Sequence, residues 1–207
     1  MFSVRLLLSV LILLLPSVAS SQPTSLQADA INALRKGGYV IVFLHGATTD
    51  QTKVDSMSRP NVSGERQLNQ LGREQAKSIR ESMHKLKIPV GQVLTSQLQR
   101  AADTGKLLGF GEVTTTLDLT ESGVALSSEE NNRRAQALRK LISTRPPVDS
   151  NLVLVSHKPN IIEAFGKSWE DIHEGEASVF APDGNGGYRL IVRIEAGDWG
   201  KLEQASN

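Results

Sequence analysis

The chain has 207 residues, of which 39% are hydrophobic and 22% charged, and its formal net charge is +1. This length is typical of one globular domain, and so small a net charge gives no indication of a nucleic-acid or polyanion surface. The absence of cysteine excludes disulfides, thiolate metal sites, a cysteine nucleophile and a lipidated N-terminal cysteine.

Residues 1–22 have the pattern of a secretory signal peptide. Arg5 supplies the positive charge and Leu6 to Leu15 the apolar core, which small residues follow. The apolar run is short for a membrane span. We therefore expect cleavage near Ala19 or Ser20 and a secreted or periplasmic protein with no stable membrane span. An uncleaved N-terminal anchor is the alternative.

The first strand after the leader ends in a histidine. A helix is expected over residues 26–36, and the apolar run 39–44 is typical of a strand buried on both faces. His45 and Gly46 follow it and begin a long polar loop, residues 47–67. Ligands bind beyond the carboxyl ends of strands in open parallel sheets. His45 is therefore well placed for chemistry, although a histidine that only closes a strand would look the same.

The rest of the chain continues to alternate. We expect a helix capped by Asn69 and ending near residue 87, a strand over 90–95, a helix over 96–108, a strand over 113–117, a loop over 118–128 and a helix over 129–144. A second apolar strand, 151–156, ends in His157, and a helix follows from about Pro159. Strands over 177–181 and 188–194, joined by a glycine-rich turn, predict an edge hairpin. This alternation predicts an α/β sandwich with a mostly parallel sheet.

Three polar motifs follow predicted strands, namely His45, His157 and the segment from Arg100 to Thr104. A parallel sheet would bring them to one end. A neutral imidazole can attack phosphorus, and fixed cationic donors stabilise charge on phosphoryl oxygens. The three motifs together therefore favour a site for an oxyanion such as phosphate.

These motifs resemble those of the histidine phosphatase superfamily, the phosphoglycerate-mutase-like proteins, and particularly its small exported bacterial branch. Leu44-His45-Gly46 matches the Arg-His-Gly signature, and Arg100 to Thr104 matches an Arg-Ala-x-x-Thr segment; Val155 to Asn160 matches the second-histidine segment, and Leu68 to Ala76 a helix start. The resemblance covers about residues 30–195. It implies a three-layer α/β/α sandwich with a mostly parallel central sheet and an antiparallel edge hairpin, in a domain over residues 26–200.

The resemblance also implies roles for individual residues. His45 would be the nucleophile that becomes phosphohistidine, His157 would donate to the transferring phosphoryl group, and Arg100 would bind its oxygens. Glu121 is the first candidate for the proton donor, and Glu174 is the second. The substrate would be a phosphorylated small molecule, and no metal or other cofactor is needed.

The sequence departs from the family signature at Leu44, where the family has a phosphate-binding arginine. Two charge-assisted hydrogen bonds of about 1.5–3 kcal/mol each would be missing, which corresponds to roughly a hundredfold to ten-thousandfold in rate. Arg66 or Lys158 could replace the lost cation. Otherwise the protein is a weak enzyme or a non-catalytic binder of phosphorylated ligands, or the sequence carries a single loss-of-function substitution.

The sequence therefore predicts a phosphomonoester hydrolase, with a catalytically impaired phosphoryl-ligand binder as the alternative. A mutase is less favoured because its substrates are usually cytoplasmic. The chain contains no Gly-x-Ser-x-Gly elbow, His-Glu-x-x-His motif or Walker loop. His45 and His157 lack the short ligand spacing that is typical of zinc sites.

Overall fold

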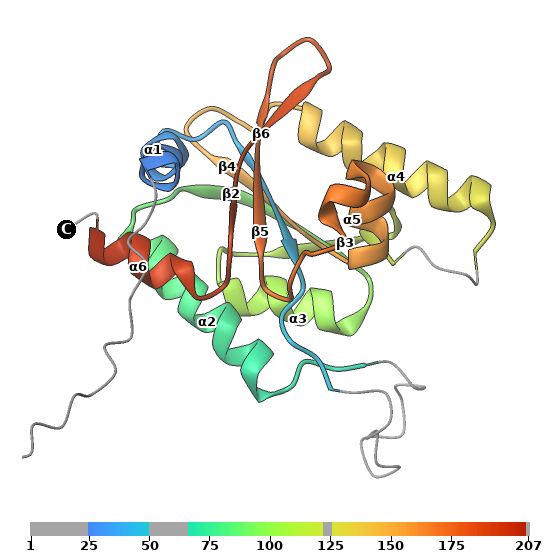
Figure 1. Cartoon of the computed structure of the whole chain (residues 1–207), viewed down its shortest axis with the longest axis horizontal. Coiled ribbons are helices and arrows are strands. Elements are labelled where there is room, and N and C mark those ends of the chain that lie inside the picture. The colour runs from blue at the N-terminus through green and yellow to red at the C-terminus, as the bar shows by residue number, and fades with distance from the viewer. Residues whose placement is uncertain (1–24, 50–65, 122–125, 206–207) are drawn as a thin grey trace, which may run out of the picture.

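The computed structural model describes residues 25–49, 66–121 and 126–205 (Figure 1). The predicted signal peptide and most of the predicted loop 47–67 lie outside these residues. None of the helices within these ranges is both long and apolar enough to traverse a bilayer.

The described residues form one six-stranded sheet with the order β3-β2-β4-β1-β5-β6. The strands are β1 Val40–Leu44, β2 Val90–Ser96, β3 Val113–Thr116, β4 Asn151–Ser156, β5 Ala177–Pro182 and β6 Tyr188–Ile194. The first four are parallel, whereas β5 is antiparallel to β1 and to β6. The expected mostly parallel sheet with an antiparallel edge hairpin is confirmed.

Helices cover both faces of this sheet. They are α1 Ser25–Leu34, α2 Gln70–Lys85, α3 Gln99–Leu108, α4 Ser128–Ser143, α5 Lys158–Phe165 and α6 Asp198–Ala205, with short 3₁₀ helices η2 Leu117–Leu119 and η3 Lys167–Trp169. Figure 1 shows α2, α3 and α6 on one side of the sheet and α4 and α5 on the other.

Two apolar cores lie between these layers because successive side chains of a strand point to opposite faces. In β1, Ile41 and Phe43 pack with α1, α2, α3 and α6, whereas Val40, Val42 and Leu44 pack with α4 and α5. Both faces of β1 are buried, as its uninterrupted apolar run predicts. The three-layer α/β/α sandwich is therefore confirmed.

Two local predictions need correction. The helix expected from Ser96 begins at Gln99, because β2 continues through Ser96 and the Ser96 hydroxyl accepts a hydrogen bond from the Leu98 N–H at 3.1 Å. Helix α6 was not predicted at all. Its two core residues, Trp199 and Leu202, are fully buried, but so short a helix shows little periodicity in the sequence.

Candidate active site

The two strand-ending histidines lie side by side. β1 and β4 are parallel neighbours, and Leu44 is in register with Ser156, so the next residues, His45 and His157, leave the sheet at the same level. Their ring centroids are 5.2 Å apart and both side chains are buried. The sheet thus brings together two imidazoles that are far apart in the sequence.

Hydrogen bonds assign the tautomer of His45. Its Nδ1 lies 2.8 Å from the Gly46 carbonyl oxygen, which can only accept, so Nδ1 carries the proton. Its Nε2 lies 3.2 Å from Nε of Arg100, which can only donate. The Nε2 lone pair therefore faces the guanidinium group.

Burial keeps both imidazoles uncharged. Burial lowers the pKa of His45 to about 4, and the positive charges of Arg100 and Arg66 act in the same direction. The pKa of His157 is also well below its ordinary value, first because of burial and then because of His45 and the two arginines. Near neutral pH the site therefore holds a neutral imidazole that can act as a nucleophile.

Arg100 connects His45 to a carboxylate. The buried guanidinium group contacts His45 through Nε and forms an ion pair with Glu121 through Nη2. The Glu121 side chain is one third exposed, whereas the Arg100 side chain is almost fully buried. Arg100 therefore lies between His45 and the first candidate acid.

Thr104 explains the spacing of the Arg-Ala-x-x-Thr segment. One turn of α3 places its hydroxyl beside the Arg100 carbonyl oxygen, to which it donates at 2.8 Å. The same hydroxyl oxygen accepts from the Gly46 N–H at 3.0 Å. The helix that carries Arg100 is thus joined directly to the backbone beside His45.

The other predicted site residues lie at different places around this centre. Arg66 is close enough to lower the pKa of both histidines, whereas Lys158 is not among the charges that do so. Within the described residues, the Lys158 side chain makes no hydrogen bond or ion pair. Glu174, the second candidate acid, accepts a hydrogen bond from the Thr48 hydroxyl at 2.9 Å.

Leu44 has apolar surroundings. Its side chain is buried in the same cluster as Leu119, Ile161 and Ile172. The Leu44 side chain therefore offers no hydrogen-bond donor to an oxyanion. The ring nitrogens of His157 also have no hydrogen-bond partner within the described residues. Among the described residues, Arg100 contacts His45 directly, and the charge of Arg66 also acts on both imidazoles.

Sequence reasoning assigned no role to Gln75. Its side-chain oxygen accepts from the Ala47 N–H at 2.9 Å, and its amide nitrogen donates to the Glu174 carbonyl at 3.3 Å. Gln75 thus ties the backbone after His45 to the loop that carries the second candidate acid. Its place in the matched helix start was the signal that could have identified it.

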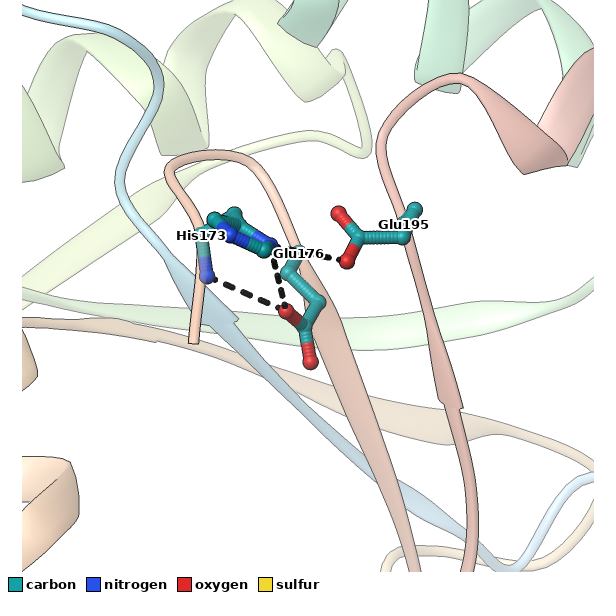
Figure 2. A group of neighbouring side chains, drawn as sticks. All are labelled: His173, Glu176 and Glu195. Carbon is teal, nitrogen blue, oxygen red and sulfur yellow. Dashed lines mark hydrogen bonds and ion pairs between the residues drawn. The ribbon is translucent and has the colours of Figure 1, made fainter. Parts of the chain in front are cut away.

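A separate group of side chains, His173, Glu176 and Glu195, has the composition of a metal site (Figure 2). Figure 2 shows the three side chains pointing toward one another from the loop before β5 and from the end of β6. Glu176 is buried but already forms an ion pair with Arg193, and His173 bonds to Glu195 at 2.9 Å. These contacts join the loop before β5 to the end of β6, which explains the group without a metal ion.

The loop that carries His173 and Glu176 also holds the backbone at His45. Between His173 and Glu176, the Gly175 N–H donates to the carbonyl oxygens of Leu44 and His45, at 3.1 and 2.9 Å. The loop before β5 therefore fixes the backbone of the proposed nucleophile.

The chain is an α/β sandwich in which His45, His157 and Arg100 meet at the carboxyl end of the parallel strands. The family model of the histidine phosphatase superfamily (branch 1) matches residues 40–126, which include His45, Arg100 and Glu121. Together with the fold, this match confirms the resemblance to that superfamily. A comparison with curated protein sequences found no significant match.

Solved structures with the same fold include several phosphatases. The protein histidine phosphatase SixA complexed with tungstate is 17% identical, with a TM-score of 0.55 over 77% of this chain and 98% of that chain. A mutant phosphoserine phosphatase from Entamoeba histolytica with bound phosphoserine is 15% identical, with a TM-score of 0.53 over 76% and 97%. A mycobacterial glucosyl-3-phosphoglycerate phosphatase complexed with VO3 is 20% identical, with a TM-score of 0.52 over 75% and 98%. At these identities the similarity shows the fold.

Proposed function

We propose that the protein hydrolyses phosphomonoesters through a phosphohistidine at His45. The observation that carries this proposal is the contact between a buried, neutral His45 and Arg100, beside the second imidazole of His157. The phosphatases with the same fold support this reaction class. The predicted signal peptide would place the activity outside the cytoplasm, which cell fractionation would test.

The reaction would proceed in two displacements. Nε2 of His45 attacks phosphorus while the bond to the leaving oxygen breaks, and Glu121 gives that oxygen its proton. Water then attacks the phosphohistidine, returns a proton to Glu121 and releases inorganic phosphate. Arg100 would bind the equatorial oxygens in both steps, and the Gly46 carbonyl would hold the Nδ1 proton throughout.

A second candidate function is the binding of phosphorylated ligands without turnover. It is favoured by Leu44, which lies in an apolar cluster at the position where the family signature has arginine. The free site also holds Arg100 in an ion pair with Glu121, so a ligand must compete with a carboxylate for the same guanidinium group.

Hydrolysis of p-nitrophenyl phosphate separates the two candidates. We expect turnover by the purified protein, its loss in His45→Ala, and acid-labile labelled phosphate on the quenched wild type. Leu44→Arg should raise kcat/KM by roughly tenfold to a hundredfold, the value of one charge-assisted hydrogen bond. Leu44→Met, which keeps the volume and adds no donor, is the matched control.

The outcomes point in different directions. Activity that appears only in Leu44→Arg supports the ligand-binding function. Activity that survives in His45→Ala at the wild-type rate contradicts both candidates, because both place the phosphoryl group on this imidazole and Arg100.

A further inference from the structure

The segment that carries the candidate acid is held by side chains along its whole backbone. The carbonyl groups of residues 118–121 all accept hydrogen bonds from side chains of other elements. Asn160 donates to the Asp118 carbonyl at 3.3 Å, and Ser156 donates to the Leu119 carbonyl at 2.9 Å. Arg134 donates to the carbonyls of Thr120 and Glu121 at 3.3 and 3.1 Å. Loop carbonyls more often face water, so four consecutive contacts of this kind indicate a segment fixed in one conformation.

Arg134 makes the contacts nearest to the acid. It projects from α4, and its side chain is only 9% exposed. Nε bonds to Glu130 one turn earlier at 2.7 Å, which leaves Nη1 for the carbonyl oxygens of Thr120 and Glu121. A helical arginine is usually solvated, so this one requires a structural explanation.

The other two donors flank His157. Ser156 is the last residue of β4, and Asn160 lies in the first turn of α5, where its amide also donates to the Ser156 hydroxyl at 3.1 Å. The strand end that presents His157 thus holds the beginning of the acid segment, while α4 holds its end. From there the Glu121 carboxylate reaches Arg100, which contacts His45.

We propose that Arg134 is a positioning residue for the phosphatase reaction. Its hydrogen bonds to the carbonyls of Thr120 and Glu121 fix the position of the Glu121 carboxyl group relative to Arg100 and the leaving oxygen. This inference rests on the proposed function, because it gives Glu121 the role of proton donor. Ser156 and Asn160 hold the other end of the segment. We refer to these three donors, Arg134, Ser156 and Asn160, as the clamp.

Two substrates with different leaving groups test this role. Nitrophenolate leaves with little need of a proton, whereas an alkoxide needs one. We expect Arg134→Gln to lower kcat on ethyl phosphate by about tenfold to a hundredfold and on p-nitrophenyl phosphate by less than about threefold, since only the acid is displaced. A loss of stability alone would lower both rates equally.

Arg139→Gln is the matched control. Arg139 lies on the same helix and also donates to two backbone carbonyls, those of Glu163 and Ala164, at 3.1 and 2.7 Å. It holds the end of α5 rather than the acid segment, so both substrates should keep their wild-type rate ratio. If Arg134→Gln does not fold, Arg134→Lys, which can reach only part of the carbonyl pair, should show a smaller change in the same ratio.

A double variant shows whether the effect of Arg134→Gln on kcat depends on Glu121. In the Glu121→Gln background, Arg134→Gln should cause no further loss on ethyl phosphate. Equal losses on both substrates, a full additional loss in the double variant, or the same ratio change in Arg139→Gln would overturn the proposal.

Hydrogen exchange separates this inference from the proposed function. Amides of residues 117–121 should exchange faster in Arg134→Gln than in the wild type or Arg139→Gln. If the wild type hydrolyses neither substrate, the proposed phosphatase function is wrong. The proposed effect of Arg134 on catalysis is then wrong as well. Unchanged exchange overturns the clamp itself, whatever the activity.

Discussion

Two uncharged imidazoles share the site with the positive charges of Arg100 and Arg66. Each positive charge disfavours a proton on His45 and His157, and burial does so more strongly because the charged form loses its hydration. The same charges attract a phosphoryl dianion. The electrostatic arrangement thus keeps the nucleophile unprotonated and favours the substrate at the same time.

The buried histidines make stability depend on pH. The pKa of His45 falls from 6.5 in the unfolded chain to about 4 in the folded one, so between these values the unfolded chain binds more protons. We expect the free energy of unfolding to fall as the pH drops through this window, by about 2 kcal/mol from His45 alone between about pH 7 and about pH 5. Urea titrations of the wild type and His45→Gln measure this difference.

His173 provides the control for that titration. Its pKa is raised by its hydrogen bond to Glu195, so its contribution is present at low pH and is lost as the pH rises. His173→Gln should therefore not reduce the acid-induced loss. If His45→Gln loses as much stability between the two pH values as the wild type does, His45 is not the buried neutral group described above.

Arg66 and Lys158 differ in their expected effect on phosphate binding. Arg66 acts electrostatically on both imidazoles, whereas Lys158 is not among the charges that do. We expect Arg66→Gln to weaken inhibition by vanadate about tenfold, the value of one charge-assisted contact near the surface. Lys158→Gln should change it by less than about twofold. The reverse order would make Lys158 the replacement for the missing arginine.

At the scale of elements, the start of α2 determines the path of the chain after His45. The Asn69 side chain caps the helix by accepting from the Gly72 N–H at 2.8 Å, and it donates to the Thr48 carbonyl at 2.9 Å. Its own N–H donates to the Ala47 carbonyl at 3.0 Å. The cap thus fixes both the helix and the segment that follows the nucleophile.

Gly72 allows this close approach. A Cβ atom there would lie 2.1 Å from the Ala47 carbonyl oxygen, so the backbone beside Gly46 would have to move. We expect Gly72→Ala to lower the free energy of unfolding by about 2–3 kcal/mol and kcat/KM by about a hundredfold. Chemical denaturation and aryl phosphate kinetics check the two effects.

Gly200 is the matched helical control. No heavy atom lies within 4 Å of a Cβ built at this position in α6. Gly200→Ala should therefore stabilise the protein by about 0.5–1 kcal/mol and leave kcat/KM unchanged. Wild-type stability in Gly72→Ala would show that the chain after His45 can move away without cost.

At the scale of the whole molecule, α6 closes one of the two cores. Trp199 is fully buried and stacks on Phe43 of β1, with ring centroids 6.2 Å apart. Its indole N–H has no hydrogen-bond partner within the described residues. The last helix therefore packs directly behind the strand that carries the proposed nucleophile.

Two substitutions of Trp199 should differ in their effect on stability. Trp199→Ala leaves a large cavity and should cost about 3–5 kcal/mol. Trp199→Phe keeps most of the apolar contact and removes the unpaired N–H, so it should cost less than about 1.5 kcal/mol. Urea unfolding followed by circular dichroism measures both, and equal losses would mean that the indole nitrogen is satisfied in solution.

Local sequence patterns were sufficient to predict the alternation of helices and strands and the motifs that end β1 and β4. Such signals are local: a strand buried on both faces is a continuous apolar run, and Asn69 can cap α2 within three residues. Because neighbouring parallel strands end at the same edge, these local signals were enough to predict that His45, Arg100 and His157 would meet.

The remaining features depended on how the elements pack together in three dimensions. Packing placed Glu121 rather than Glu174 on Arg100, surrounded Leu44 with apolar side chains, and made Arg134 a buried donor to the acid segment. These properties depend on contacts between segments far apart in the chain. The physical reason is that burial and hydrogen-bond partners are set by packing, which no periodicity or spacing records.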